Sequence, residues 1–209
     1  MKSTIKLLAV FALMLATFSQ HTDSAATNVY KFKGKSIHAY FSNVDLSGCV
    51  VTTAFVFASE QLAQYVAGAG IPSTGVELYV SKYNQCTEET LISAENIVPV
   101  PQADLNISGS LRKAVLKTTV NVYDAEKNVS FEVFVDLSWT GTDTIVRQNT
   151  TIQYDFPDCR TNDHSNSTFH FAQASGTVSD GTTNFSPDPS TFGTISLERS
   201  GEISINCGP

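Results

Sequence analysis

Residues 114–139 read AVLKTTVNVYDAEKNVSFEVFVDLSW, and apolar residues alternate with polar ones on both sides of the central DAEKN segment. A period of two is typical of a β-strand with one buried and one solvent-facing side, because successive side chains point to opposite faces. The two arms therefore predict a long antiparallel hairpin. One face collects eleven residues, all apolar except Thr118. We expect this hairpin to lie at the centre of the fold, with Phe131 and Trp139 buried and Glu132 and Asp136 in solvent.

Seven other segments carry strand patterns. Residues 49–58 are apolar on both faces, which predicts a central strand covered on each side. Other strands are expected at 29–41, 75–82, 144–154 and 167–178, and a second hairpin turning at Ser200 and Gly201 joins 194–198 to 203–207. Residues 59–69 fit either a short helix or an irregular loop, and 157–166 and 180–189 read as loops. A total of about ten strands predicts an all-β fold, an antiparallel β-sandwich, with a closed β-barrel as the alternative.

The composition is that of a single globular domain. The chain has 209 residues, of which 42% are hydrophobic and 16% charged, enough to bury a sizeable core. Its formal net charge is −7, and lysine and arginine are scattered rather than gathered in a stripe. Nucleic acid is therefore not expected as a partner.

The first 26 residues have the pattern of a secretory signal peptide. Lys2 and Lys6 precede an apolar run at 7–18, and small residues at positions 24–26 mark a cleavage site before Thr27. A membrane anchor is the alternative, but a run of about a dozen residues is shorter than the ~20 that span a bilayer. We expect a signal peptide at 1–26, a single all-β domain at 27–209, no membrane span, and a secreted, extracellular protein.

Four cysteines, Cys49, Cys86, Cys159 and Cys207, lie in the expected mature part. An even number in an exported chain predicts two disulfides, and the wide spacing does not suit a metal site, which needs close ligand pairs. Three connectivities are open. We favour Cys49–Cys86 and Cys159–Cys207, because each bond then joins nearby segments within one half of the chain.

Catalytic signatures are missing from the sequence. The G-x-S-x-G and H-E-x-x-H motifs are both absent. Glu77, Glu132 and Asp136 project from predicted strands and are the carboxylates that a polysaccharide hydrolase would use. Strand rise, however, places the Cα atoms of Glu132 and Asp136 about 13 Å apart, which is wide for such a pair. A solvated sheet face accounts for them better.

Metal ligands are also only weakly indicated. His164 and His170, with Asp158 and Asp163 nearby, are a possible metal set, but a loop histidine and a strand histidine facing water are the simpler interpretation. Two predicted loops are rich in aspartate: one holds Asp155, Asp158 and Asp163, and the other holds Asp180 and Asp188. We expect no cofactor, with calcium bound by these loops as the alternative. Aspartate is equally an ordinary turn former.

These observations favour a secreted, non-enzymatic module with a binding, adhesion or structural role toward an unknown extracellular ligand or surface. A secreted polysaccharide hydrolase and a barrel-type carrier of an apolar small molecule are the alternatives. Carbohydrate binding needs exposed aromatic rings, yet Trp139, the only tryptophan, falls on the apolar face. Phe134 is an apolar residue on the polar face and marks a possible contact patch.

Overall fold

The computed structural model describes residues 28–65, 72–156, 159–186 and 189–207. These residues form nine β-strands, and their helical content is a single 3-10 turn, η1, at Gln102–Asp104. The strands are β1 (Asn28–Val44), β2 (Val50–Tyr65), β3 (Pro72–Asn84), β4 (Glu89–Pro99), β5 (Leu105–Ile107), β6 (Lys113–Asp124), β7 (Val129–Asp155), β8 (Cys159–Ser179) and β9 (Phe192–Cys207). The predicted signal peptide and Thr27 lie outside the described residues.

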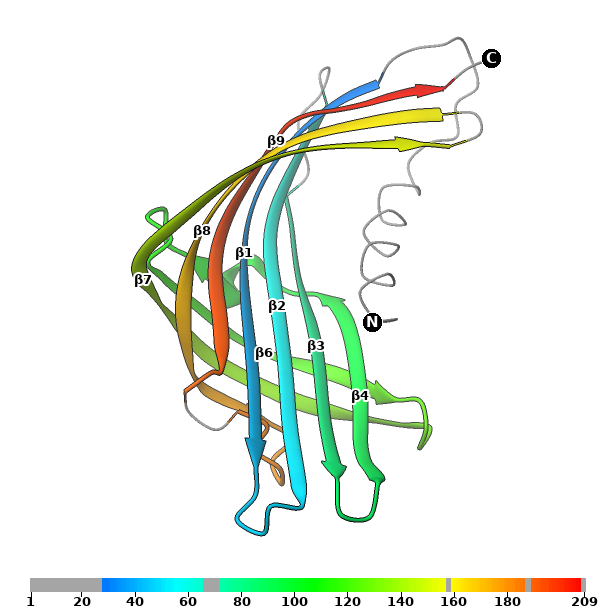
Figure 1. Cartoon of the computed structure of the whole chain (residues 1–209), viewed down its shortest axis with the longest axis vertical. Coiled ribbons are helices and arrows are strands. Elements are labelled where there is room, and N and C mark those ends of the chain that lie inside the picture. Colours follow the sequence, from blue (N-terminus) through cyan, green and yellow to red (C-terminus); the bar gives the residue numbers. More distant parts are fainter. Residues whose placement is uncertain (1–27, 66–71, 157–158, 187–188, 208–209) are drawn as a thin grey trace.

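All nine strands belong to one antiparallel sheet, in the order β4-β3-β2-β1-β9-β8-β7-β6-β5. β4 also pairs with β6, with Ala94 opposite Asp124 and Glu95 opposite Tyr123, so the pairing closes into a ring. The long strands β7, β8 and β9 bend strongly along their length (Figure 1). The predicted all-β, antiparallel class is confirmed, and the ring is consistent with either the sandwich or the barrel.

A buried carboxylate joins the two strands that close the ring. Asp124, at the end of β6, accepts the backbone N–H of Ser93 on β4 at 3.1 Å. It also accepts the N–H groups of Glu126 and Lys127 in the β6–β7 turn, each at 3.1 Å. Burial opposes ionisation of Asp124, but these donors hold its pKa below the ordinary value.

The predicted hairpin is strands β6 and β7. Ala114 pairs with Trp139, and Asp124 with Val129, so the register is the one that the alternating pattern requires. The even-numbered residues of β6 are buried and the odd-numbered ones exposed. Phe131 is only half-buried, contrary to expectation; it lies two residues after the start of β7 and packs against the edge of the core.

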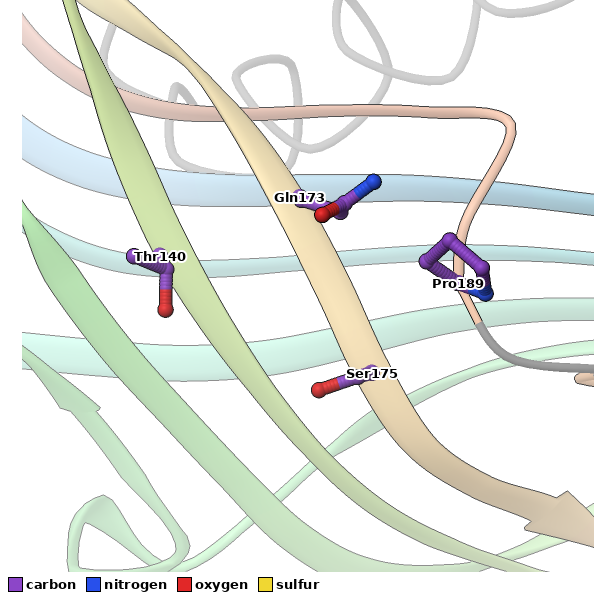
Figure 2. A pocket seen from close by; sticks show the side chains of 4 residues that line it. All are labelled: Thr140, Gln173, Ser175 and Pro189. Carbon is purple, nitrogen blue, oxygen red and sulfur yellow. The ribbon is translucent and has the colours of Figure 1, made fainter.

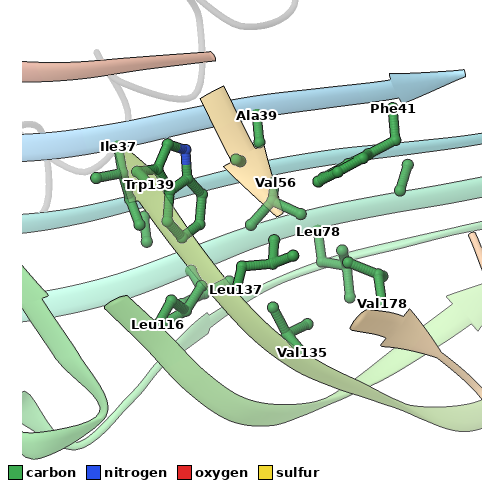
Figure 3. Packing of buried hydrophobic residues seen from close by; sticks show 14 of the residues in the cluster. Ile37, Ala39, Phe41, Val56, Leu78, Leu116, Val135, Leu137, Trp139 and Val178 are labelled. Atoms are coloured by element: carbon green, nitrogen blue, oxygen red, sulfur yellow. The ribbon is translucent and has the colours of Figure 1, made fainter. Parts of the chain in front are cut away.

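The core fills the inner side of the ring. Trp139, Phe41 and Phe185 are among its largest fully buried side chains. Figure 3 shows Trp139 and Leu137 of β7 directed toward the β1 and β2 side chains. The indole N–H of Trp139 donates to the backbone carbonyl of His38 at 2.8 Å, which satisfies its polar atom. The prediction that Trp139 is a core residue is confirmed.

Three strand boundaries differ from the prediction, because the backbone of these segments pairs with a neighbouring strand on each side. Residues 192–207 form one strand, and Gly201 falls at a register shift between Ser200 and Glu202 rather than in a hairpin turn. Likewise β7 runs unbroken past Gly141, where the register also shifts. Residues 159–166 were expected to be a loop from their polar composition, but they pair with both β7 and β9.

Two further segments were assigned wrongly. Residues 59–65 were expected to be helix or loop, yet they continue β2 along β1, with Ser36 opposite Ser59; residues 66–69 lie outside the described part. β4 was not predicted at all. Its sequence mixes charged and apolar residues without a clean period of two, and its strand character comes from pairing with β3.

Cys49 and Cys86 form a disulfide, with Cα atoms 5.2 Å apart, as predicted. The bond ties the start of β2 to the β3–β4 turn. Cys159 and Cys207 lie directly opposite each other on β8 and β9. This register is the one that the predicted second disulfide requires, and that bond remains a prediction.

Candidate functional site

Aromatic side chains gather on the outer face of five neighbouring strands. Ile37 and Ala39 of β1 point into the core, so the intervening His38 and the following Tyr40 point outward. The other members come from outward positions of the neighbouring strands. We call this set the aromatic face: Phe169 and Phe171 (β8), Phe192 (β9), His38 and Tyr40 (β1), Phe55 and Phe57 (β2), and Tyr79 (β3).

The strand register places these rings side by side. Tyr40 lies opposite Phe55 on β2 and opposite Phe192 on β9, while His38 lies opposite Phe57. Phe55 in turn lies opposite Tyr79 on β3. The aromatic face therefore crosses the sheet perpendicular to its strands.

Direct ring contacts join four of these strands. The His38 ring centroid is 4.9 Å from that of Phe55 and 5.2 Å from that of Phe192. Phe192 is 6.2 Å from Phe171, which packs edge-to-face on Phe169 at 5.6 Å. Edge-to-face packing of this kind holds rings in fixed orientations.

Several of these rings reach solvent. The exposed fractions of Tyr40, Phe171 and Phe192 are 36%, 40% and 42%. The remaining members are half-buried. The expectation that residues 49–58 are covered on both sides is therefore wrong: their inner face packs in the core, and their outer face carries Phe55 and Phe57 into this partly exposed patch.

Two carboxylates lie at the β3–β4 end of the aromatic face. Glu77 lies opposite Phe57 on one side and Ile97 on the other. Glu95 lies opposite Tyr79. Burial raises the pKa of Glu77, and the nearby charge of Glu95 raises it further.

The remaining electrostatics of this face are negative or neutral. Burial lowers the pKa of His38, which favours the uncharged imidazole. No lysine or arginine occupies the outward positions of the described strand segments 36–42, 51–59, 75–81, 93–99, 167–175 and 192–196. Glu77 and Glu95 are therefore the acidic side chains of these segments, and no basic side chain lies among their outward positions.

A shallow polar hollow of about 360 Å³ lies beside the β8 end of the aromatic face. Figure 2 shows Thr140 of β7, Gln173 and Ser175 of β8, and Pro189 around it. Gln173 follows Phe171 on the same face of β8. The hollow thus offers two hydroxyl groups and one amide next to the aromatic rings.

The structure does not bring the predicted carboxylates together. Glu132 and Asp136 lie on the outer face of β7, whereas Glu77 lies on β3, with β4 and β6 between them in the ring. Asp136 forms an ion pair with Lys117 at 2.9 Å. Glu77 is joined by Glu95, which the sequence analysis did not select.

The histidines considered as metal ligands have other roles. His170 was expected to face water, but it is buried and its Nδ1 lies 3.0 Å from the carbonyl of Thr142. His164 is exposed, with Nδ1 3.0 Å from the hydroxyl of Thr151. The described residues contain no group of three or more metal-ligating side chains.

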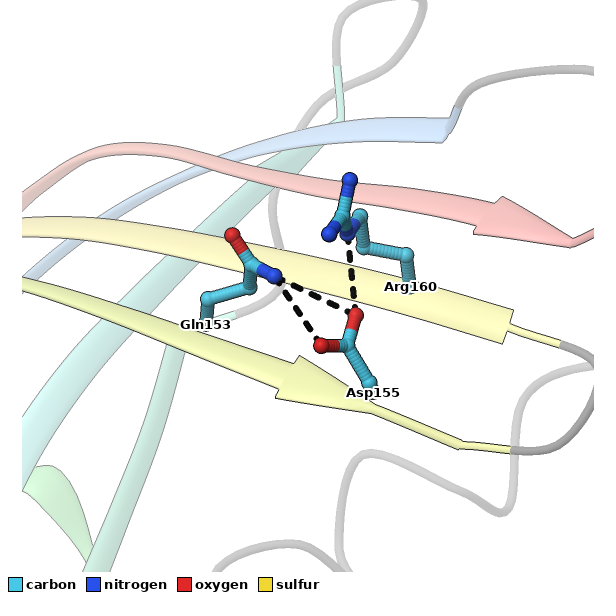
Figure 4. A network of polar contacts seen from close by, with 3 residues as sticks. All are labelled: Gln153, Asp155 and Arg160. Atoms are coloured by element: carbon cyan, nitrogen blue, oxygen red, sulfur yellow. Dashed lines mark hydrogen bonds and ion pairs between the residues drawn. The ribbon is translucent and has the colours of Figure 1, made fainter.

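The aspartates considered for calcium are also separated. Asp155 bonds to Arg160 at 2.9 Å and to Gln153, as Figure 4 shows. Asp163 is placed by the register on the opposite face of the sheet from Asp155. Asp180 accepts the N–H groups of residues 182 and 183 and acts as a turn former. Asp158 and Asp188 lie outside the described residues.

Comparisons with known proteins add no assignment. No protein-family model, no curated protein and no solved structure matches this chain. Within the described part of the chain, no helix has the length and apolar character needed to cross a membrane.

The aromatic face was missed in the sequence because its members are far apart along the chain. A signal was nevertheless present. His38 and Tyr40, Phe55 and Phe57, and Phe169 and Phe171 are three pairs of ring-bearing residues spaced two apart. Each pair occupies one face of its strand. The pairs could have been recognised as one patch only with the strand order known.

Proposed function

We propose that this chain is a secreted, non-enzymatic binding module that holds an extended carbohydrate chain on the aromatic face. The observation that carries the proposal is the row of partly exposed rings on adjacent strands. Aromatic rings pack well against the C–H faces of sugar rings. Neighbouring strands are about 4.8 Å apart, so the rings repeat along a line, which suits a polymer better than a single small molecule.

The surroundings of the aromatic face support the same function. The hydroxyl groups of Thr140 and Ser175 and the amide of Gln173 provide hydrogen-bond partners for sugar hydroxyl groups. The rings are mounted on paired strands, not on loops. Little conformational entropy is lost when such a preorganised surface binds its ligand.

The alternatives have less support in the described residues. A carrier needs an internal cavity, and the inner side of the ring is occupied by large side chains such as Trp139, Phe41 and Phe185. A hydrolase needs two carboxylates that flank one bond in a cleft. Glu132 and Asp136 lie on an outward strand face, and Asp136 is already paired with Lys117. Glu77 and Glu95 are neighbours, but they lie on the open outer face of the sheet, and the polar hollow is lined by Thr140, Gln173, Ser175 and Pro189 instead.

Secretion is part of the proposal. The leader pattern of residues 1–26 motivates it, and the Cys49–Cys86 disulfide is typical of proteins from oxidising compartments. N-terminal sequencing of exported protein should begin at Thr27. An exported protein that retains its leader would contradict the proposed cleavage site.

The binding function is tested by removing exposed rings. Phe192→Ala and Tyr40→Ala should each weaken binding of soluble oligosaccharides at least tenfold, measured by calorimetry on a panel of neutral and charged hexamers. Phe134→Ala is the matched control, because Phe134 is exposed to a similar extent on β7, outside the aromatic face. Circular dichroism establishes that each variant is folded. Equal affinities in all three variants, or no binding of any hexamer, would overturn the proposal.

A further inference from the structure

We infer that the sugar polymer bound on the aromatic face carries free amino groups, which Glu77 and Glu95 recognise. This inference rests on the proposed function and adds to it the chemical class of the ligand. It follows from the charge on the aromatic face and from the surroundings of the two carboxylates.

Glu77 is an unusual carboxylate for a sheet surface. It stands between the apolar side chains of Phe57 and Ile97 and is half-buried there. Partial burial next to apolar groups removes solvation from a carboxylate and disfavours its charged form, whereas a cation bound beside it favours that form. Among the described residues, neither Glu77 nor Glu95 forms an ion pair; the ion pairs found there are Arg112–Asp143, Lys117–Asp136 and Arg160–Asp155.

Glu95 brings a second negative charge to the same place. It lies opposite Tyr79 on β3, one diagonal step from Glu77. Two carboxylates side by side repel each other in the free protein. A single ammonium group placed between them removes this repulsion, so the free protein is prepared for a cation.

The aromatic rings strengthen the same preference. Phe57 and Tyr79 flank the two carboxylates, and the face of an aromatic ring attracts an ammonium group. The outward positions around them hold no lysine or arginine that would compete for the carboxylates. An amino sugar unites the two features required here, a C–H face for the rings and an ammonium group for the carboxylates.

A polypeptide rich in lysine is the competing cationic ligand. It has ammonium groups but lacks the rigid C–H faces that the row of rings from Phe171 to Phe55 can stack against. The polar hollow around Gln173 also suits hydroxyl groups better than long aliphatic side chains. We therefore assign the surface to an amino sugar polymer.

The experiment compares two hexasaccharides that share one backbone. One is a β-1,4-linked glucosamine hexamer, and the other is its fully N-acetylated counterpart. Calorimetry at about pH 6 and low salt measures both affinities for the full chain. We expect the glucosamine hexamer to bind at least tenfold tighter.

The charge-removing variants are Glu77→Gln, Glu95→Gln and their combination, which preserve side-chain shape. The double variant should bind both hexamers with similar affinity, while its affinity for the N-acetylated hexamer stays within about twofold of the wild type. Glu132→Gln is the control, because it removes an equal charge from the exposed outer side of β7. It should retain the preference.

The outcomes separate the inference from the proposed function. Equal binding of both hexamers by the wild type, still sensitive to Phe192→Ala, would overturn the inference and leave the proposed function intact. Binding of neither hexamer would overturn the inference, and it would also overturn the proposed function if every other hexamer of the neutral and charged panel failed to bind. A Glu132→Gln variant that also loses the preference, or a lysine homopolymer fragment of equal length that binds as tightly as the glucosamine hexamer, would show general charge attraction and overturn the inference alone.

Discussion

The assignment of inner and outer faces can be tested by a pair of truncations on β7. Leu137 has an exposed fraction of 1%, while Phe134 has 41%. The two residues lie three positions apart on opposite faces of the same strand. Phenylalanine is the larger side chain, so if the loss of unfolding free energy on truncation to alanine depended on size alone, it would be greater at Phe134. If the loss depends on burial, it is greater at Leu137.

The magnitudes follow from the surroundings of each residue. Leu137 pairs with Leu116 on β6 and Gly176 on β8, so backbone ladders on both sides limit relaxation around a cavity. Leu137→Ala should therefore lower the free energy of unfolding by about 3–5 kcal/mol. Phe134 contacts the Lys117 ammonium group, which lies 5.9 Å from the ring centroid. Loss of this contact and of partial burial should cost about 1–2 kcal/mol.

Urea unfolding provides the measurement, because the fluorescence of Trp139, the only tryptophan, reports on loss of the core. Both variants should keep the wild-type dependence of free energy on urea, with Leu137→Ala shifting the midpoint further. If Phe134→Ala proves equal or more damaging, the faces of β7 are assigned the wrong way round. The core described above would then be incorrect.

Three further predictions concern the backbone, pH and the second disulfide. Gly176 has φ +130°, and a Cβ there would lie 2.1 Å from the carbonyl oxygen of Asp136. Gly176→Ala should therefore lower the unfolding free energy by at least ~2 kcal/mol in a denaturant melt. The control is Gly109→Ala, because a Cβ at Gly109 would meet nothing within 4 Å. Because the pKa of Asp124 is lowered in the fold, its stabilising contribution is complete above the ordinary aspartate pKa and is lost as pH falls below it. Asp124→Asn should thus be less stable than wild type at pH 7, and the difference should shrink with acid; a constant difference would contradict this account. Digestion without reductant should yield one cross-linked peptide pair containing Cys159 and Cys207, whereas a free thiol at either would refute the second bond.

The alternating segments of the fold could be predicted from sequence, and the segments defined by pairing could not. The hairpin at 114–139 has a period of two and apolar residues on one face, and these local properties fix both strand and register. β4 and residues 159–166 lack such a pattern. They are strands because neighbouring strands satisfy their backbone hydrogen bonds on one or both sides, which is information from distant parts of the chain.

The candidate site could not be predicted from the sequence for the same reason. Phe55 and Phe57 were correctly placed on one face of a strand, but that face was expected to be covered. Whether an outer face is covered depends on the number of layers, which the sequence does not state locally. Glu95 was overlooked because it lies on the strand that was not predicted, although its neighbour Tyr79 lies within a predicted one.

The two faces of the sheet have different roles in this proposal: the inner face forms the core, and the outer face binds the ligand. The inner positions of β1, such as Ile37 and Ala39, are fully buried and hold the ring together. Other outer positions of the same strands, such as Ser36 and Thr194, carry small polar side chains, so the strands form without an aromatic residue at every outer position. Partly exposed rings at Tyr40 and Phe192 therefore gain less from burial in the free protein than core residues do, and they expose apolar area that a ligand can cover. Substitutions at these two positions should separate binding from folding, because their main contribution is expected only when a ligand is present.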